Sequence, residues 1–129
     1  MKFSEQEQRI LASVLQMLGS GQATSQNLED YLIAYQVLGR LVAVAQGESE
    51  MAEAIRKVEW AKSFSGHKRG EDKVSDRTAE ALADEETADL RKIEVKAREN
   101  WMKLKNTRES VWEAIQAIKF LGRMDGRVS

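Results

Sequence analysis

The feature that most constrains the fold is a stretch with neither glycine nor proline, from residue 76 to residue 121. Apolar residues recur in it every three or four positions, and Arg108 takes the one polar place in the series. The apolar members are Leu90, Ile93, Ala97, Trp101, Leu104, Val111, Ile115 and Ile118. This spacing lines one face of a helix. It predicts a helix of about 30 residues or more, which spans about 45 Å.

A helix of this length needs a partner of similar length to cover its apolar face. Residues 25–63 provide one, with Ser25 as the expected N-cap and a bend or short break at Gly47, after which Ser49 can cap a restart. The apolar series of this segment is Leu28, Tyr31, Leu32, Tyr35, Leu38, Val42, Met51, Ala54, Ile55, Val58 and Ala61. We therefore expect the two segments to pack against each other.

Shorter signals mark the remaining boundaries. Ser4 with Glu7 three positions later forms a capping box, so residues 4–18 read as an amphipathic helix that the Gly-Ser-Gly sequence at 19–21 ends. Val74 and Ser75 restart a helix after an aperiodic segment that contains Gly66, and the sequence at 84–87 can bend that helix. No proline occurs anywhere, and residues that favour helix are abundant.

Together these signals predict an all-α fold. The architecture is an elongated antiparallel helical hairpin, or coiled-coil-like bundle, with a short N-terminal helix. Residues 1–22 would form the N-terminal helix and its break. Residues 23–129 would form the hairpin, with helices at about 25–63 and 75–123 joined by a mobile loop at about 64–74.

Composition narrows the setting. The chain has no cysteine, which removes disulfide and thiolate chemistry. No segment reaches the roughly 18 uncharged apolar residues of a membrane span, and charged residues near the N-terminus do not fit a signal peptide. We expect a cytoplasmic protein that does not associate with membranes.

Positive charge gathers in two places that could bind nucleic acid. The first is the segment that follows the second helix, with Lys62, His67, Lys68, Arg69 and Lys73. The second is the basic helix, with Arg91, Lys92, Lys96, Arg98, Lys103 and Lys105. Cations contact phosphates without regard to sequence, and aromatic residues beside them can stack bases. For the first group we favour a mobile, solvated hinge between two helices over nucleic-acid binding, because connections between helices commonly have this composition.

Three aromatic residues are predicted to lie at an interface. Trp60 and Trp112 fall one position off the apolar series, where they can flank the core or seal a contact between chains, and Phe120 is placed with them. Trp101 lies on the series itself and is expected in the core. Because long apolar faces with exposed ends favour self-association, we expect a homo-oligomer.

No catalytic motif emerges, so we expect neither an enzyme nor a cofactor. The single histidine, His67, has no fixed acid partner in the sequence, and the glycines fit no phosphate-binding loop. One alternative stays open. Glu50 with Glu53, and Glu86 with Asp89, have the spacing by which all-α nucleotide pyrophosphohydrolases hold magnesium, although such pairs are common in an acidic chain.

Residues 56–123 carry a family resemblance. The strings "VEWAKSFS", "VSDRTAEALADEETADLRK" and "AREN…LKNTRESVWEAIQAIKFLG" resemble small helical proteins of tailed bacteriophages that are encoded among genes for DNA recombination and replication. The resemblance implies an accessory or adaptor protein in the host cytoplasm. It supplies no catalytic residues. We expect such a protein to act through a phage or host protein, and the basic residues named above add single-stranded DNA as an expected partner. The alternative is a pure protein-binding module, either an inhibitor of a host or defence protein or a structural component of the particle.

Overall fold

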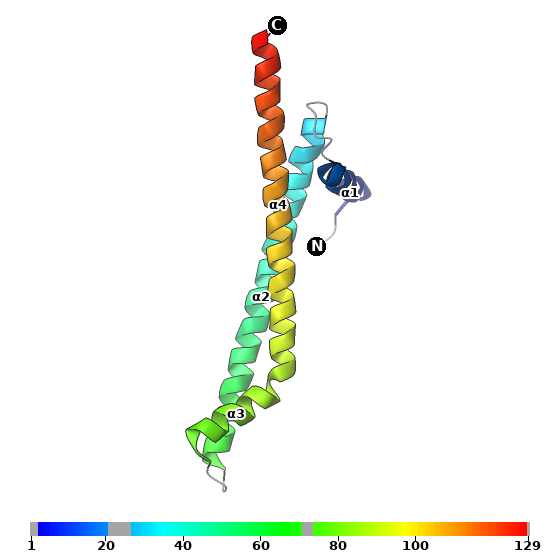
Figure 1. Cartoon of the computed structure of the whole chain (residues 1–129). Coiled ribbons are helices and arrows are strands. Elements are labelled where there is room, and N and C mark those ends of the chain that lie inside the picture. The colour runs from blue at the N-terminus through cyan, green and yellow to red at the C-terminus, as the bar shows by residue number, and fades with distance from the viewer. Residues whose placement is uncertain (1–2, 21–26, 71–73, 129) are drawn as a thin grey trace. The chain divides into compact units, whose positions relative to one another are not determined.

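The computed structural model describes residues 3–20, 27–70 and 74–128. Within these ranges the chain forms four helices and no strand: α1 (Glu5–Ser20), α2 (Leu28–Arg69), α3 (Asp76–Glu86) and α4 (Ala88–Val128) (Figure 1). The all-α prediction is confirmed. The N-cap Ser25, the cation Lys73 and Gly21 of the predicted break lie outside the described residues. The other two residues of that break, Gly19 and Ser20, belong to α1, so the helix runs past its predicted end at residue 18.

The chain divides into two compact units. Unit 1 comprises Met1–Ala43 and Met102–Ser129, and unit 2 comprises Val44–Trp101. In each unit a part of α2 lies beside a part of α4, and the two helices run in opposite directions (Figure 1). The predicted pairing of the two long helices is therefore present.

Unit 1 has a conventional apolar core. α1, α2 and α4 all contribute to it, and its fully buried members are Val14, Tyr31, Ala34, Leu38, Val111, Ile115 and Ile118. The residues from α4 are those that the three-and-four spacing predicted. Val14 shows that α1 packs within its own chain. Burial of each large apolar side chain contributes about 1.5–3 kcal/mol, so this cluster stabilises unit 1.

The start of α1 has the predicted capping box. The backbone N–H of Glu7 donates to Ser4 Oγ at 3.0 Å, and the N–H of Ser4 donates to Glu7 Oε1 at 3.1 Å. These bonds satisfy N–H groups that have no partner inside the helix. Arg40 of α2 pairs with Glu7 and lies 4.6 Å from the centre of the Phe3 ring. The Ser4 N–H, followed by Arg40, lowers the pKa of Glu7.

α2 differs from the prediction in two places. It passes through Gly47 without a break, and Ser49 is a buried residue inside the helix rather than a cap. It also continues past residue 63 to Arg69, so most of the predicted loop is helical. Cations in the last turn are favourable beside the negative end of the helix dipole. Lys68 additionally binds Asp76 at 2.7 Å and the Val74 carbonyl at 3.2 Å.

The junction of α3 and α4 follows the sequence more closely. Ser75 caps α3 by accepting a hydrogen bond from the backbone N–H of Thr78 at 3.2 Å. The predicted bend occurs at Thr87, the only residue between the two helices, whose hydroxyl donates to the Ala83 carbonyl at 2.7 Å. α4 then runs through Gly122 to Val128, beyond the predicted end at 123.

Candidate functional site

The interior of unit 2 is polar. Glu94 on α4 is only 6% exposed and pairs with Arg56 on α2, while Arg98 approaches its other oxygen at 3.6 Å. Ser49 and Thr87 are also buried. The buried apolar residues of unit 2, among those described, are all alanines: Ala45, Ala79 and Ala83. Taking charges out of water costs free energy that their attraction only partly offsets, so this interior contributes little net stability.

Several of the larger apolar residues of unit 2 lie on its outside. Met51 is 62% exposed and Val58 53% exposed, although the sequence placed both in the buried series. At 100° per residue they occupy the side of α2 opposite Ser49 and Arg56. Ile93 is a second correction, because it is 58% exposed and the neighbouring Glu94 takes the buried position. The polar interior therefore leaves an apolar surface uncovered within the described residues.

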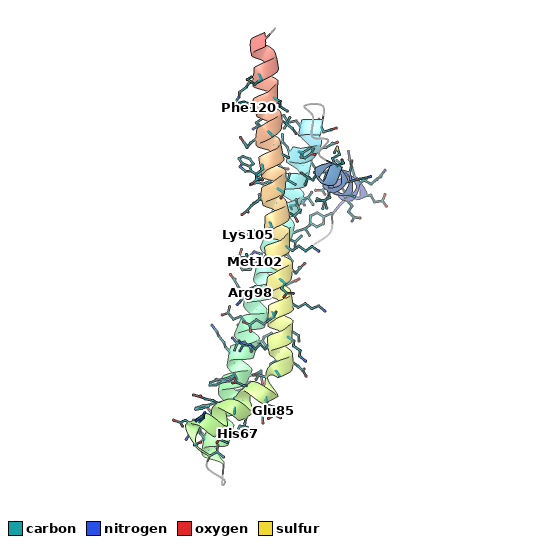
Figure 2. All side chains as sticks on the ribbon, viewed as in Figure 1. His67, Glu85, Arg98, Met102, Lys105 and Phe120 are labelled. Carbon is teal, nitrogen blue, oxygen red and sulfur yellow. The ribbon has the colours of Figure 1, made fainter. Side chains whose placement is uncertain are left out.

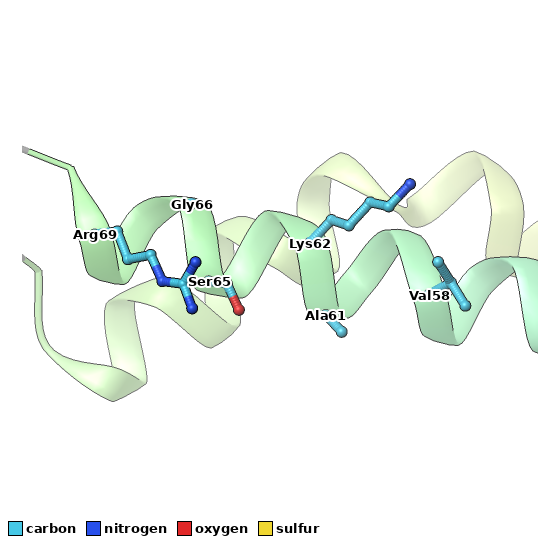
Figure 3. Close-up of a pocket in the computed structure, with 6 residues that line it drawn as sticks. All are labelled: Val58, Ala61, Lys62, Ser65, Gly66 and Arg69. Atoms are coloured by element: carbon cyan, nitrogen blue, oxygen red, sulfur yellow. The ribbon is translucent and has the colours of Figure 1, made fainter.

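We call the exposed series on α2 the α2 stripe. It consists of Val44, Gly47, Met51, Ala54, Val58, Ala61 and Ser65, of which all but Ser65 are exposed. Successive members are three and four residues apart, which is the a and d pattern of a coiled-coil seam. Val44, Gly47 and Ser65 were not in the apolar series predicted from the sequence. The seven-residue repeat is the signal in the sequence that could have identified them. A shallow hollow lies at its C-terminal end, lined by Val58, Ala61, Lys62, Ser65, Gly66 and Arg69 (Figure 3).

The described members of the first group of predicted cations, Lys62, His67, Lys68 and Arg69, lie on the end of α2 rather than in a loop. Lys62 contacts Glu59 at 3.4 Å, and Lys68 is held by α3 as described above. Arg69 is exposed and lines the hollow of the α2 stripe. Carboxylates next to these side chains reduce the positive charge that a phosphate would meet. The structure therefore brings the group together without making it a strong anion site.

The second group is more open. Arg91, Lys92 and Lys96 are exposed on α4 and form no ion pair within the part of the chain that the structure describes. They line a shallow hollow together with Asp84, Ala88, Val95 and Glu99. Arg98 belongs to the Glu94 pair instead. Lys103 and Lys105 are exposed on the part of α4 in unit 1, where Figure 2 labels Lys105.

The aromatic residues have distinct surroundings. Trp60 on α2 donates from Nε1 to Asp84 on α3 at 2.8 Å, which joins the two helices inside unit 2. Its ring also stacks on that of Phe64, one turn further along α2, with ring centres 5.3 Å apart. Trp112 is 45% exposed and lies 5.3 Å from the Tyr35 ring. Phe120 on α4 is 60% exposed (Figure 2). Trp112 and Phe120, both in unit 1, therefore remain accessible to a partner.

The single histidine acts as a structural contact. His67 Nε2 lies 2.9 Å from Glu86 Oε1, and the Ser63 hydroxyl donates to the other oxygen of Glu86. These contacts, Ser63 first, lower the pKa of Glu86. The residues that the structure describes contain no group of three or more His, Asp or Glu side chains that could hold a metal ion. The carboxylate pairs at 50 and 53 and at 86 and 89 are accordingly not assembled.

No protein-family model matches this chain, and comparison with curated proteins and with solved structures gives no match. Among the described helices, none combines the length and the apolar character that crossing a membrane requires.

Proposed function

We propose that this chain is a non-enzymatic adaptor that works in phage DNA recombination or replication, through protein contacts and through single-stranded DNA. The observation that carries the proposal is the distribution of polarity in unit 2, where an ion pair occupies the interior and apolar side chains face outward. Apolar side chains that gather on one exposed face are typical of surfaces that bind other proteins. The setting in recombination or replication is supported by the resemblance of residues 56–123 alone.

α4 offers a second apolar surface in unit 1. Phe120 is 60%, Leu121 54% and Met124 43% exposed, so three large side chains lie close together in sequence on the C-terminal part of the helix. Aromatic residues and methionine are enriched at the centre of protein interfaces. This surface fits a phage or host protein that presents an apolar groove, as in helix-in-groove recognition.

The α4 cations support the DNA contact. Arg91, Lys92 and Lys96 project from adjacent turns, and no carboxylate among the described residues pairs with them. Three phosphate contacts by side chains of this kind give weak, sequence-independent affinity that falls as salt rises. Val95 lies in the same hollow and provides an apolar surface beside the cations.

Binding of an oligothymidine about 30 nucleotides long, followed by fluorescence anisotropy from about 50 to about 300 mM salt, tests this contact. The variant Arg91→Ala/Lys92→Ala/Lys96→Ala should bind more weakly. Its affinity should also fall less steeply with salt, so that the magnitude of the slope of log affinity against log salt decreases by about 2. The control Arg9→Ala/Arg77→Ala/Lys119→Ala removes the same charge elsewhere on the surface. Equal effects of the two triple variants would reject a specific DNA contact.

The protein contact needs a separate experiment. Wild-type chain and the variant Phe120→Glu should be used as bait in cells infected by the phage that encodes the chain, and each retained protein should then be purified and tested directly. A recombination or replication protein that binds the wild type and not the variant supports the adaptor. The alternative, a pure protein-binding module, is favoured if the purified partner is a host defence or particle protein and DNA binding is absent.

A further inference from the structure

Large and small residues alternate along the α2 stripe. Val44, Met51 and Val58 occupy every seventh position and are 38%, 62% and 53% exposed. The positions three residues after each of them hold the small residues Gly47, Ala54 and Ala61, and Ser65 takes the next seventh place. Small residues allow a second helix to approach closely, and the larger ones then need small residues opposite them to avoid either overlap or voids.

This alternation distinguishes the two ways in which copies of the stripe can pair. In a parallel pair each position meets itself, so Met51 would face Met51 and the glycines would face each other across a gap. In an antiparallel pair the a positions meet d positions. Val44 then faces Ala61 of the second copy, Met51 faces Ala54, and Val58 faces Gly47. Each layer of the antiparallel pair therefore combines one large and one small residue.

Charges beside the stripe favour the same arrangement. Glu48 and Glu50 flank its N-terminal half, while Lys57 and Lys62 flank its C-terminal half. Antiparallel pairing brings Glu50 toward Lys57, and Glu48 toward Lys62, of the second copy. Parallel pairing would instead place like charges together, which opposes association. The lysines also contact Glu53 at 2.8 Å and Glu59 at 3.4 Å on their own helix, in exposed pairs that contribute little by themselves.

We propose that the α2 stripe binds the α2 stripe of a second copy of this chain, in antiparallel orientation. The hollow around Ala61 then receives Val44 of the second copy, while Lys62 borders the contact (Figure 3). This inference rests on the proposed function as an interaction protein, and it places self-association at the stripe rather than at the predicted residues Trp60, Trp112 and Phe120. The α4 cations are not part of the stripe and stay available for DNA.

Sedimentation equilibrium of the full chain tests the self-association. Over about 5 to about 200 µM the mass should rise from 14.6 kDa to twice that value. Met51→Glu/Val58→Glu should remain monomeric over this range, with helicity unchanged by circular dichroism. The matched control Ile93→Glu/Val95→Glu, on exposed residues of α4, should dimerise as the wild type does. A monomeric wild type, or equal loss in both variants, would overturn the proposal.

Cross-linking tests the orientation. The chain has no cysteine, so single cysteines can be introduced without background. On mild oxidation an equimolar mixture of Val44→Cys and Ala61→Cys should give the mixed disulfide dimer. Each variant alone should give little. Efficient cross-linking of Val44→Cys to itself would establish a parallel pair and reject the antiparallel assignment.

Charge reversal provides a third, independent readout. Glu48→Lys/Glu50→Lys should weaken self-association at least about tenfold. In the antiparallel contact the two new lysines of each copy would face Lys62 and Lys57 of the other copy, so attraction is replaced by repulsion. Adding Lys57→Glu/Lys62→Glu to the same chain should restore it, and failure of this rescue would count against the assignment. Failure of the adaptor proposal is distinguishable, since a chain that dimerises normally can still lack DNA and partner binding. Conversely, a chain that stays monomeric but binds DNA and a partner protein would reject the stripe pairing and leave the adaptor proposal standing.

Discussion

The guanidinium of Arg108 on α4 packs directly against Gly39 on α2. A Cβ placed on residue 39 would come within 2.8 Å of the nearest guanidinium nitrogen. In this position Arg108 lies 3.9 Å from the centre of the Tyr35 ring and donates from Nε to the Tyr35 carbonyl at 3.2 Å. Arg108, the one polar member of the α4 series, therefore has a defined binding position in unit 1. Only glycine at position 39 leaves room for its guanidinium.

A double-mutant cycle should detect this relationship. Alanine is better than glycine in a helix by about 1 kcal/mol, so Gly39→Ala should stabilise the Arg108→Ala variant by about that amount. In the wild type the gain should be lost, because the new methyl group displaces the guanidinium from Tyr35. Urea denaturation gives the free energy of unfolding of the wild type, the two single variants and the double variant. The control Gly66→Ala, where an added Cβ meets nothing within 4 Å, should stabilise both backgrounds equally.

The buried pair in unit 2 makes a second prediction. Arg56→Ala should destabilise by about 3 kcal/mol, because it leaves the Glu94 charge without its principal partner in a site that is 6% exposed. Replacing both residues with apolar ones, Arg56→Met/Glu94→Leu, should restore the wild-type free energy of unfolding or exceed it. Arg98→Ala is the control. Its side chain is 57% exposed, so its loss should cost less than about 1 kcal/mol. Equal costs for Arg56→Ala and Arg98→Ala would contradict this account.

Tyr31 in the core of unit 1 gives a third prediction. Its side chain is fully buried, its hydroxyl has no hydrogen-bond partner among the described residues, and burial raises its pKa. An unpaired buried hydroxyl costs about 1–3 kcal/mol. Tyr31→Phe should therefore leave the chain as stable as the wild type or more stable by about 1 kcal/mol, measured by thermal unfolding. Tyr35→Phe, at a half-buried residue of the same helix, serves for comparison; a marked loss of stability in Tyr31→Phe would show that the hydroxyl is bonded.

The pH dependence follows from Glu86. Its pKa is lowered in the folded chain by Ser63 and His67, relative to 4.5 for an unperturbed carboxyl. The folded state therefore favours the carboxylate, and the stabilisation is present above about pH 4.5 and lost as pH falls through the lowered pKa. Melting temperatures between about pH 7 and about pH 3 should fall less steeply for Glu86→Gln than for the wild type. Glu85→Gln removes a neighbouring exposed carboxyl as the control, and indistinguishable curves for the wild type and Glu86→Gln would refute the assignment.

Much of the fold could be predicted from the sequence because local rules and packing agree in unit 1. The capping box at Ser4, the cap at Ser75 and the bend at Thr87 depend on side chains within a few residues of each other, and all three are present. The α4 series from Val111 to Ile118 is buried as its spacing predicts. Helix ends were less predictable, since contacts with α3 extend α2 to Arg69.

The candidate site was harder to predict because apolar periodicity shows which residues share a face and not which face turns inward. In unit 2 the α2 stripe is longer and more apolar than the opposite face, and the buried partner Glu94 appears in sequence as one more acidic residue beside Ile93. Arg56 becomes its counterpart only through the packing of α2 on α4. The cations of α4 could be named from sequence, whereas the pairing of Arg98 and the openness of Lys96 required the structure.

The polar attachment of α3 has a consequence for motion. α3 buries only Ala79 and Ala83, and its contacts with α2 include the bonds from Trp60 to Asp84 and from Lys68 to Asp76. Segments with few buried apolar contacts open at lower free energy than a core, and salt weakens exposed ion pairs. Backbone amides of α3 should therefore exchange with deuterium well before those around Leu38 and Ile115, and faster still as ionic strength rises.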